Sequence, residues 1–338
     1  MITLDGSMGE GGGQVLRTAL SLSLVTGQPF VLDRIRAGRQ KPGLARQHLT
    51  CVLAAAEVGN AAVEGAELGS QRLAFKPRGL RAGEYAFAIG TAGSTTLVLQ
   101  TLLPALLCAN APSTLQLSGG THNPLAPPFD FLAKSFAPAL RAMGIRLDLQ
   151  LLRHGFAPAG GGAIACTIGP AKPQPSEFLQ REAVGLPRAR VLLAKIQTSV
   201  GERELHVVRR RLDLRAEQVH IEHVDSHGPG NMLLLEFGNR FVTEVIGVPG
   251  ERGTSAEQVA EQACALAKRY LASDAPVGEH LADQMLLPMA MAGGGVFRTL
   301  EPTLHTRTNA EVIERFVPVK FAFAEDGAAW RVSVAGRT

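Results

Sequence analysis

The clearest chemistry in the sequence is a basic loop that follows a short apolar strand near the N-terminus. Five bases occur there with no acidic residue between them: Arg34, Arg36, Arg39, Lys41 and Arg46. Arginine presents its N–H groups as a planar fork that fits phosphate and carboxylate oxygens. The loop therefore predicts a binding site for an anionic ligand.

Two further loops occupy the equivalent place in later stretches of the chain. The loop 119–128 carries Thr121, His122, Asn123, Pro124, Pro127 and Pro128, and the loop 301–308 carries His305 and Arg307. Loops between strands and helices gather beside helix N-termini, where unpaired N–H groups and the helix dipole favour anions. A basic loop, an apolar wall and an isolated histidine predict a site for a phosphate-rich ligand with an aromatic base. Three solvated connectors are the alternative.

A lone acid inside a glycine run marks the start of the first predicted helix. Glu10 lies between Gly9 and the run Gly11–Gly13, with Arg17 one turn into the helix. An unobstructed carboxylate of this kind suits a divalent metal that is carried by phosphates. A flexible N-terminal turn is the alternative.

The familiar motifs of several other site classes are missing. No Gly-Lys dipeptide occurs, which excludes a Walker A loop, and no G-x-G-x-x-G follows a strand and opens a helix. His220 and His223 lie on a predicted strand, where their spacing places them on opposite faces, so a zinc site with His227 is disfavoured. No G-x-S-x-G elbow indicates a serine hydrolase.

The candidate loops are positioned by three stretches that share one order of elements: helix, strand, loop and helix. We expect first helices at 13–26, 94–109 and 281–292, strands at 30–35, 114–117 and 296–300, and second helices at 44–58, 129–143 and 309–316. Strand-like alternation follows each second helix, at 71–75, 145–151 and 319–323. The sequence predicts an α/β fold of three repeated units, each with two helices on one face of a small sheet.

An extra segment separates the second stretch from the third. It contains predicted strands at 190–196, 218–223, 232–236 and 240–245 and predicted helices at 202–215 and 255–272. We therefore predict a large three-unit domain, residues 1–179 and 275–338, with a small α/β domain inserted at 180–274. The run Arg209–Arg211 on its first helix favours a solvated face. RNA contact and formation of a homodimer both stay open as roles for this domain.

The composition of the chain excludes some further classes of protein and indicates a cellular location. The chain has 338 residues, 34 Lys+Arg against 30 Asp+Glu, and 46 % hydrophobic residues, which excludes a disordered chain. The longest apolar run, 95–108, contains Gln100 and Pro104, so no membrane span is expected. Four scattered cysteines without a C-x-x-C pair favour a reducing, cytoplasmic location.

Several longer motifs together resemble the RNA 3'-terminal phosphate cyclases, and the resemblance runs from Ile2 to about Trp330. The motifs are Gly9–Gln14 with Arg17, Lys41–Leu44, Gln47-His48, Gly90–Ser94, His154–Gly162 and His280–Gln284. The resemblance implies three repeats of two helices on a four-stranded sheet, with a small domain inserted in the third. It also implies a relation to the fold of enolpyruvyl transferases and of a translation initiation factor's C-terminal domain.

The resemblance implies an activity and its cofactors. Such enzymes use ATP and a divalent metal (Mg²⁺ or Mn²⁺) to convert an RNA 3'-phosphate end into a 2',3'-cyclic phosphate. A histidine, matched here by His305, is first adenylylated. AMP then passes to the RNA 3'-phosphate, and the neighbouring 2'-OH closes the ring and releases AMP. A neutral imidazole nitrogen is a competent nucleophile near pH 7.

The resemblance also assigns the other site residues. Glu10 would bind the metal, Arg36 and Arg39 would hold phosphates, Gln100 would lie near ATP, and Pro127 would flank the adenine. His280, Leu281, Ala282, Asp283 and Gln284 match the nucleotide-binding segment, with Asp283 as its polar anchor and His280 where some relatives have Tyr. RNA-phosphate contacts would come from Arg17, Gln47 and His48.

Two other functions stay open. Cyclase-like proteins of ribosome assembly share the fold and bind RNA without adenylylation, but they lack the histidine that this chain keeps at position 305. An enolpyruvyl-type transferase would use a set of phosphate-binding Lys and Arg residues that is not visible here.

Overall fold

The computed structural model describes residues 1–336 and contains four four-stranded sheets, three of which share one strand order. In the first unit the sheet runs β1-β2-β4-β3. Its elements are β1 (Ile2–Asp5), α1 (Gln14–Thr26), β2 (Phe30–Asp33), α2 (Arg46–Val58), β3 (Ala62–Glu64) and β4 (Leu73–Lys76). The first two strands are parallel and the last two antiparallel to their neighbours.

The second unit repeats this order in the sheet β5-β6-β8-β7. Its elements are β5 (Glu84–Ala88), α3 (Thr95–Leu107), β6 (Ser113–Gly119), α4 (Phe129–Phe131), a π-helical turn (Leu132–Phe136), α5 (Ala137–Ala142), β7 (Leu147–Arg153) and β8 (Gly162–Ile168). The hydroxyl of Ser94 accepts a hydrogen bond from Leu97 N and so begins α3.

The third unit follows the same order in the sheet β9-β14-β16-β15, with the extra segment between its first strand and its first helix. Its elements are β9 (Glu177–Phe178), α8 (Glu279–Ala292), β14 (Gly294–Thr299), α9 (Leu304–Phe316), β15 (Val319–Asp326) and β16 (Ala329–Gly336). The insertion therefore lies within the third unit, as the resemblance implies.

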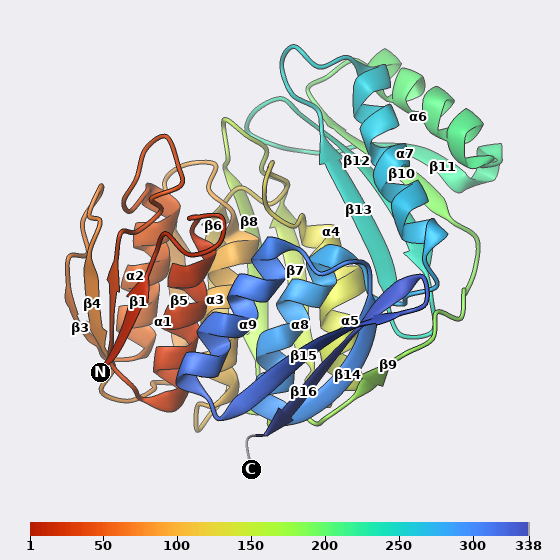
Figure 1. Cartoon of the computed structure of the whole chain (residues 1–338). Helices are drawn as coiled ribbons and strands as arrows, with labels where there is room; N and C mark the ends of the chain where they lie inside the picture. The colour runs from red at the N-terminus through yellow and green to blue at the C-terminus, as the bar shows by residue number, and fades with distance from the viewer. Residues whose placement is uncertain (337–338) are drawn as a thin grey trace.

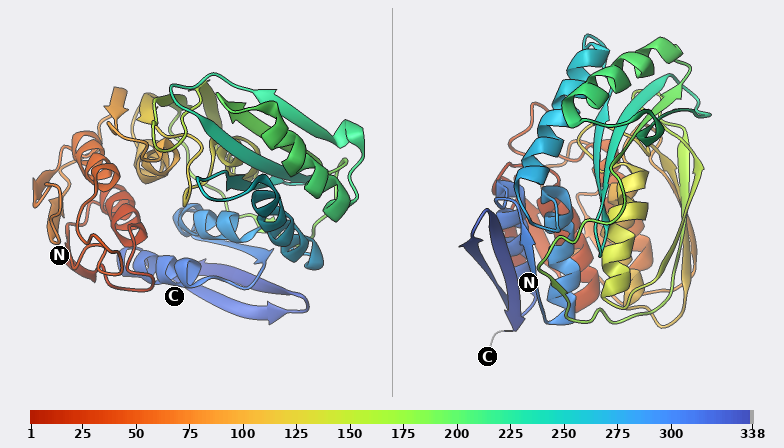
Figure 2. Two further views of the ribbon diagram at one scale, coloured as in Figure 1. Left: turned by 90° about the horizontal axis from the view of Figure 1, so that it is seen from above. Right: turned by 90° about the vertical axis from the view of Figure 1, so that its right-hand side faces the viewer.

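The helices of the three units pack on one another in the centre, and the three sheets lie outside them (Figures 1 and 2). Burying apolar helix stripes against helices and sheets together produces one continuous core, which includes Leu16, Leu102 and Leu286 at 0 % exposure. Loops at the ends of these helices therefore approach one another from three units.

The inserted segment forms a body with its own hydrophobic core. Its elements are β10 (Arg188–Ala194), α6 (Thr198–Leu212), a 3₁₀ turn (Ala216–Gln218), β11 (Val219–His223), β12 (Gly230–Gly238), β13 (Thr243–Pro249) and α7 (Ala256–Ala272). Helices α6 and α7 pack together beside the sheet β11-β10-β12-β13 (Figure 1). The boundaries at 180 and 274 remain a prediction.

One predicted element differs in a way that bears on function. The sequence placed His305 in a loop and began the last helix at Asn309, but α9 begins at Leu304. Thr303 supplies the reason, because its hydroxyl accepts a hydrogen bond from Thr306 N and caps the helix five residues earlier. His305 consequently lies in the first turn of α9.

Strands β1, β3, β5, β8, β9 and β16 are absent from the sequence prediction, because most are short or carry small residues whose strand state depends on their neighbours. Within residues 1–336, no helix combines the length and apolarity that a membrane crossing requires.

Candidate active site

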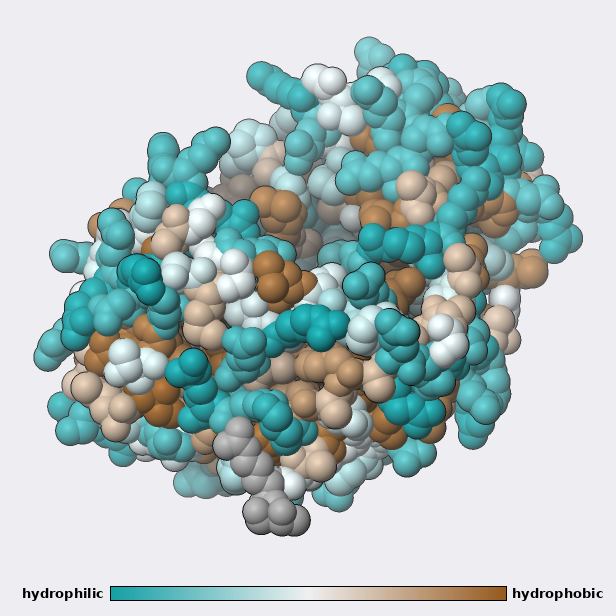
Figure 3. Space-filling model, viewed as in Figure 1, coloured by the Kyte–Doolittle hydropathy of each residue, from teal (hydrophilic) through white to brown (hydrophobic). Residues whose placement is uncertain are grey.

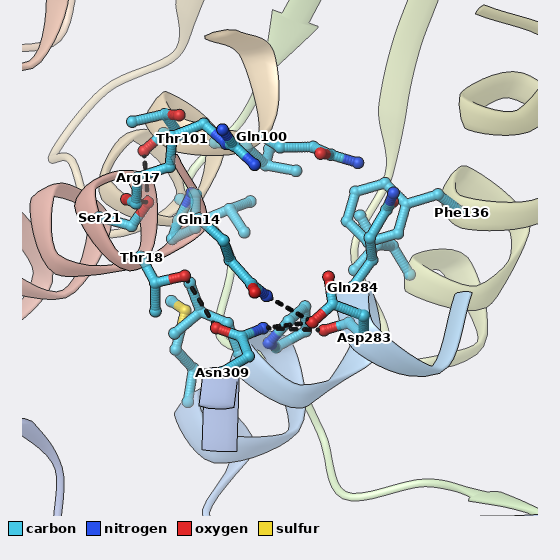
Figure 4. A pocket seen from close by; sticks show the side chains of 17 residues that line it. Gln14, Arg17, Thr18, Ser21, Gln100, Thr101, Phe136, Asp283, Gln284 and Asn309 are labelled. Atoms are coloured by element: carbon cyan, nitrogen blue, oxygen red, sulfur yellow. Dashed lines mark hydrogen bonds between the residues drawn. The ribbon is translucent and has the colours of Figure 1, made fainter. Parts of the chain in front are cut away.

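His305 is held against a carboxylate of a neighbouring helix. Its Nδ1 lies 3.2 Å from Oδ2 of Asp283, and its side chain is 36 % exposed. The other carboxylate oxygen, Oδ1, accepts hydrogen bonds from Gln14 Nε2 at 2.6 Å and from Asn309 Nδ2 at 2.9 Å (Figure 4). Helices α1, α8 and α9 thus supply the four side chains of one connected network.

This network fixes which nitrogen of His305 can react. A carboxylate beside Nδ1 favours the tautomer that carries its hydrogen there and leaves a lone pair on Nε2. In the described part of the chain, Nε2 has no hydrogen-bond partner. The imidazole is therefore oriented with an unengaged nucleophilic nitrogen.

A cavity of about 410 Å³ adjoins His305 and brings together half of the predicted site residues. Glu10, Arg17, Arg36, Arg39, Gln47, His48 and His305 all line it. The loop residues 123–126 form another part of its wall. The space-filling view shows a recess in the surface between the large body and the inserted body (Figure 3).

The bases in this cavity differ in how much of their hydrogen-bonding capacity is used. Arg36 donates to the carbonyls of Lys41 and Gly43 at 3.0 and 2.8 Å, so it also shapes its own loop. No other side chain within residues 1–336 pairs with the guanidinium of Arg17, and burial lowers the pKa of this group. An anion is the ligand that would satisfy it.

His48 lies among these bases as a neutral side chain. Burial and then the positive charges of Arg17, Arg36 and Arg39 lower its pKa to about 3. Its ring is therefore uncharged at pH 7. A role for His48 at a phosphate would rest on a neutral hydrogen bond and not on charge.

A second cavity, of about 80 Å³, shares Gln14 and Arg17 with the first. Gln100, Asp283 and Gln284 also line it (Figure 4). Nε2 of Gln100 and Oε1 of Gln284 are buried without hydrogen-bond partners. Unpartnered buried polar atoms are costly, so a donor and an acceptor here are available to a polar ligand.

The remaining residues of the predicted nucleotide site lie outside both cavities. Pro127 uses its carbonyl to accept from Thr96 Oγ1 at 2.8 Å, and His280 has a side chain that is 68 % exposed. Leu281 and Ala282 have 0 % exposure in the hydrophobic core. Their side chains therefore support α8 from the core, and their contact with a nucleotide stays a prediction.

Sequence reasoning missed two members of the network. Gln14 opens α1 directly after the glycine run, and Asn309 lies one helical turn after His305. With α9 begun at Leu304, the spacing of four residues would have placed Asn309 beside His305 on one helix face.

Glu10 fits a role as a single metal ligand. Its carboxylate is 48 % exposed at the cavity, and its nearest cationic partner is Arg39 at 3.8 Å. Within residues 1–336, no three His, Cys, Asp or Glu side chains cluster as a metal site. The phosphates of a ligand would have to supply further oxygens beside Glu10.

Comparison with known proteins agrees with the sequence motifs. A family model described as RNA 3'-terminal phosphate cyclase matches residues 8–323. The chain is 53 % identical over 339 residues to a protein of Koribacter versatilis (strain Ellin345) named RNA 3'-terminal phosphate cyclase. That match covers 100 % of this chain and 96 % of the relative.

Proposed function

Since this chain belongs to the RNA 3'-terminal phosphate cyclase family of ATP-dependent ligases, we propose that it works through a covalent histidyl-AMP on His305. The observation that supports this most strongly is the pairing of Nδ1 with Asp283, which leaves Nε2 unengaged beside a basic cavity.

In the first step Nε2 of His305 attacks the α-phosphorus of ATP. An N–P bond forms, the bond to the bridging oxygen breaks, and pyrophosphate leaves. The imidazole keeps its Nδ1 hydrogen and becomes positively charged, and Asp283, 3.2 Å away, stabilises that charge.

In the second step an oxygen of the RNA 3'-phosphate attacks the same phosphorus. The N–P bond breaks, its electron pair returns to Nε2, and AMP is now joined to the RNA end by a phosphoanhydride. In the third step the 2'-oxygen attacks the 3'-phosphorus, its proton passes to solvent, and AMP leaves. Because this closure is intramolecular, proximity supplies much of its acceleration.

The bases of the large cavity would hold the phosphates. Arg17, Arg36 and Arg39 line it together with the first turn of α9, whose unpaired N–H groups favour anions. Glu10 would hold a divalent cation that neutralises phosphate charge when bound. Gln47 and His48 line the same cavity and would contact the RNA phosphate.

The nucleotide base would use the second cavity and the residues around it. Gln100 Nε2 and Gln284 Oε1 offer a donor and an acceptor without partners, which fits the edge of an adenine. The exposed ring of His280 and the ring of Pro127 would flank the base.

Incubation with ATP labelled on the α-phosphate, with Mg²⁺, tests this proposal. The wild-type chain should take up acid-labile label, and His305→Ala should take up none. His220→Ala, on the inserted body, serves as the matched control and should label like the wild type. Equal labelling of His305→Ala would contradict the role of His305, and no labelling of the wild type would favour a non-catalytic RNA-binding role.

A further inference from the structure

A buried carboxyl group of the inserted body lies against the start of helix α8. Glu244 on β13 is 4 % exposed, and the backbone N–H of Gly278, directly before α8, donates a hydrogen bond to it. A Cβ atom added to Gly278 would lie 2.0 Å from Oε1 of Glu244. Only glycine leaves room for the carboxyl group at this place.

Two more side chains of the inserted body hold the same segment. Asn239 Nδ2 donates to the carbonyl of Pro276 at 3.0 Å, and the hydroxyl of Tyr270 donates to it at 3.4 Å. Because all of these bonds end on backbone atoms, the path of residues 276–278 depends on the inserted body.

The segment leads directly into the catalytic network. The first helical hydrogen bond of α8 runs from Ala282 N to the carbonyl of Gly278 at 2.9 Å. Asp283, which orients His305, follows in the next position, and Gln284 reaches the second cavity. A helical turn is stiff, so a displacement of Gly278 is transmitted to these side chains.

We propose that Glu244 is a positioning residue, through which the inserted body fixes the first turn of α8 and thereby the productive geometry of the nucleotide site. This inference rests on the proposed function, since it assigns the inserted body a part in ATP use.

The carboxyl group is costly as a purely structural element. Oε2 of Glu244 is buried without a partner, and burial raises the pKa of this group to about 7. An apolar side chain of similar size would avoid both costs. The presence of a carboxyl group at position 244 is explained if its contact with Gly278 positions the site.

The inserted body contains a matched control. Glu204 on α6 is also fully buried, also has an unpartnered Oε2, and has its pKa raised by burial to about 7. Its other oxygen accepts from Asn231 Nδ2 at 2.9 Å, within the inserted body. Variants of Glu204 therefore perturb the same body without touching α8.

The experiment measures the ATP dependence of His305 labelling, as the labelling rate constant divided by the KM for ATP. Glu244→Leu should lower this ratio of rate constant to KM about 10- to 100-fold, the scale expected when reacting groups are misplaced by about 1 Å. Glu244→Gln should restore most of it, because its amide oxygen still accepts from Gly278 N. Glu204→Leu should leave it at the wild-type value.

Gly278→Ala tests the same contact from the other side and should reproduce the loss, since its Cβ displaces the carboxyl group. This variant decides the question if Glu244→Leu does not fold. Wild-type ATP dependence in Glu244→Leu or Gly278→Ala, or an equal loss in Glu204→Leu, would overturn the inference. An unlabelled wild type would instead refute the proposed function.

Discussion

Gln14 donates a 2.6 Å hydrogen bond to Asp283, and this bond joins the first helix of the first unit to the first helix of the third. Asp283 in turn holds His305, so the orientation of this imidazole depends on contacts between units. The site is a property of the assembled helices and not of one loop.

The first prediction concerns Asp283. Asp283→Asn should reduce His305 labelling by on the order of 10²- to 10⁴-fold, because the amide no longer stabilises the charged imidazole or its tautomer. Pre-steady-state labelling measures this rate. Glu311→Gln, an exposed acid on α9, should label normally. If Asp283→Asn labelled at the wild-type rate, Asp283 would have no part in orienting the histidine.

Metal dependence provides a second prediction. Glu10→Gln should raise the Mg²⁺ concentration needed for half-maximal labelling, by about tenfold or more, because among residues 1–336 Glu10 supplies the one carboxylate that lines the cavity. A titration of labelling against Mg²⁺ measures this. The exposed Glu64 is the control residue, and Glu64→Gln should not shift the midpoint. An unshifted midpoint in Glu10→Gln would remove Glu10 from the metal site.

The unpartnered amides of the second cavity predict opposite effects on folding and on binding. Gln284→Met should leave the free energy of unfolding unchanged or raise it by about 1 kcal/mol, because a buried unsatisfied acceptor is removed. The same change should weaken ATP binding. Urea unfolding and calorimetric titration with ATP measure the two effects, and unchanged ATP affinity would show that Gln284 does not contact the nucleotide.

The interface between the large body and the inserted body contains a buried ion-pair network. Arg190 on β10 pairs with Asp130 of α4, and also with Glu236 at 2.8 Å. Desolvation opposes ionisation of Asp130, but His122 and Arg190 together hold its pKa well below its usual range. Arg190→Met should cost about 2–3 kcal/mol of unfolding free energy, because it removes the cation that Asp130 and Glu236 share and leaves them only His122 and Lys134. Urea unfolding tests this, and a loss below about 1 kcal/mol would contradict it.

The pH dependence of stability follows from the buried acid Glu204. Burial raises its pKa from 4.5 to about 7, so the folded chain binds more protons than the unfolded chain between these values. Stability should therefore fall as pH rises from about 4.5 to about 7, by at most about 3 kcal/mol for this group. Thermal unfolding across this range should be flatter for Glu204→Gln. An identical slope in the variant would contradict the assignment.

Apolar spacing was sufficient to predict most helices. Helices α2 and α7 bury one stripe each, α1 is buried over most of its surface, and all three end near the residues expected. It failed at the first turn of α9. Thr308 and Asn309 are each 6 % exposed but polar, and they line the two cavities of the site. Polar residues that face a site interrupt the hydrophobic period and resemble a loop.

The site was predictable where a motif carries its own chemistry, as with the basic loop and His305. The role of Asp283 beside His305 was not, because 22 positions separate them and only the packing of α8 against α9 brings them together. The same packing explains Leu281 and Ala282, which share a segment with Asp283 but face the core. A contiguous motif does not reveal which of its side chains point inward.

Strand β9 pairs with β14 although the whole inserted body lies between them along the chain. During synthesis from the N-terminus, the first two sheets have all their strands before the inserted body emerges, whereas the third must wait for it. Pairing two strands so far apart in the sequence has an entropic cost of loop closure unless the intervening chain has already folded. A compact inserted body shortens that gap, so its own folding prepares the last sheet to assemble.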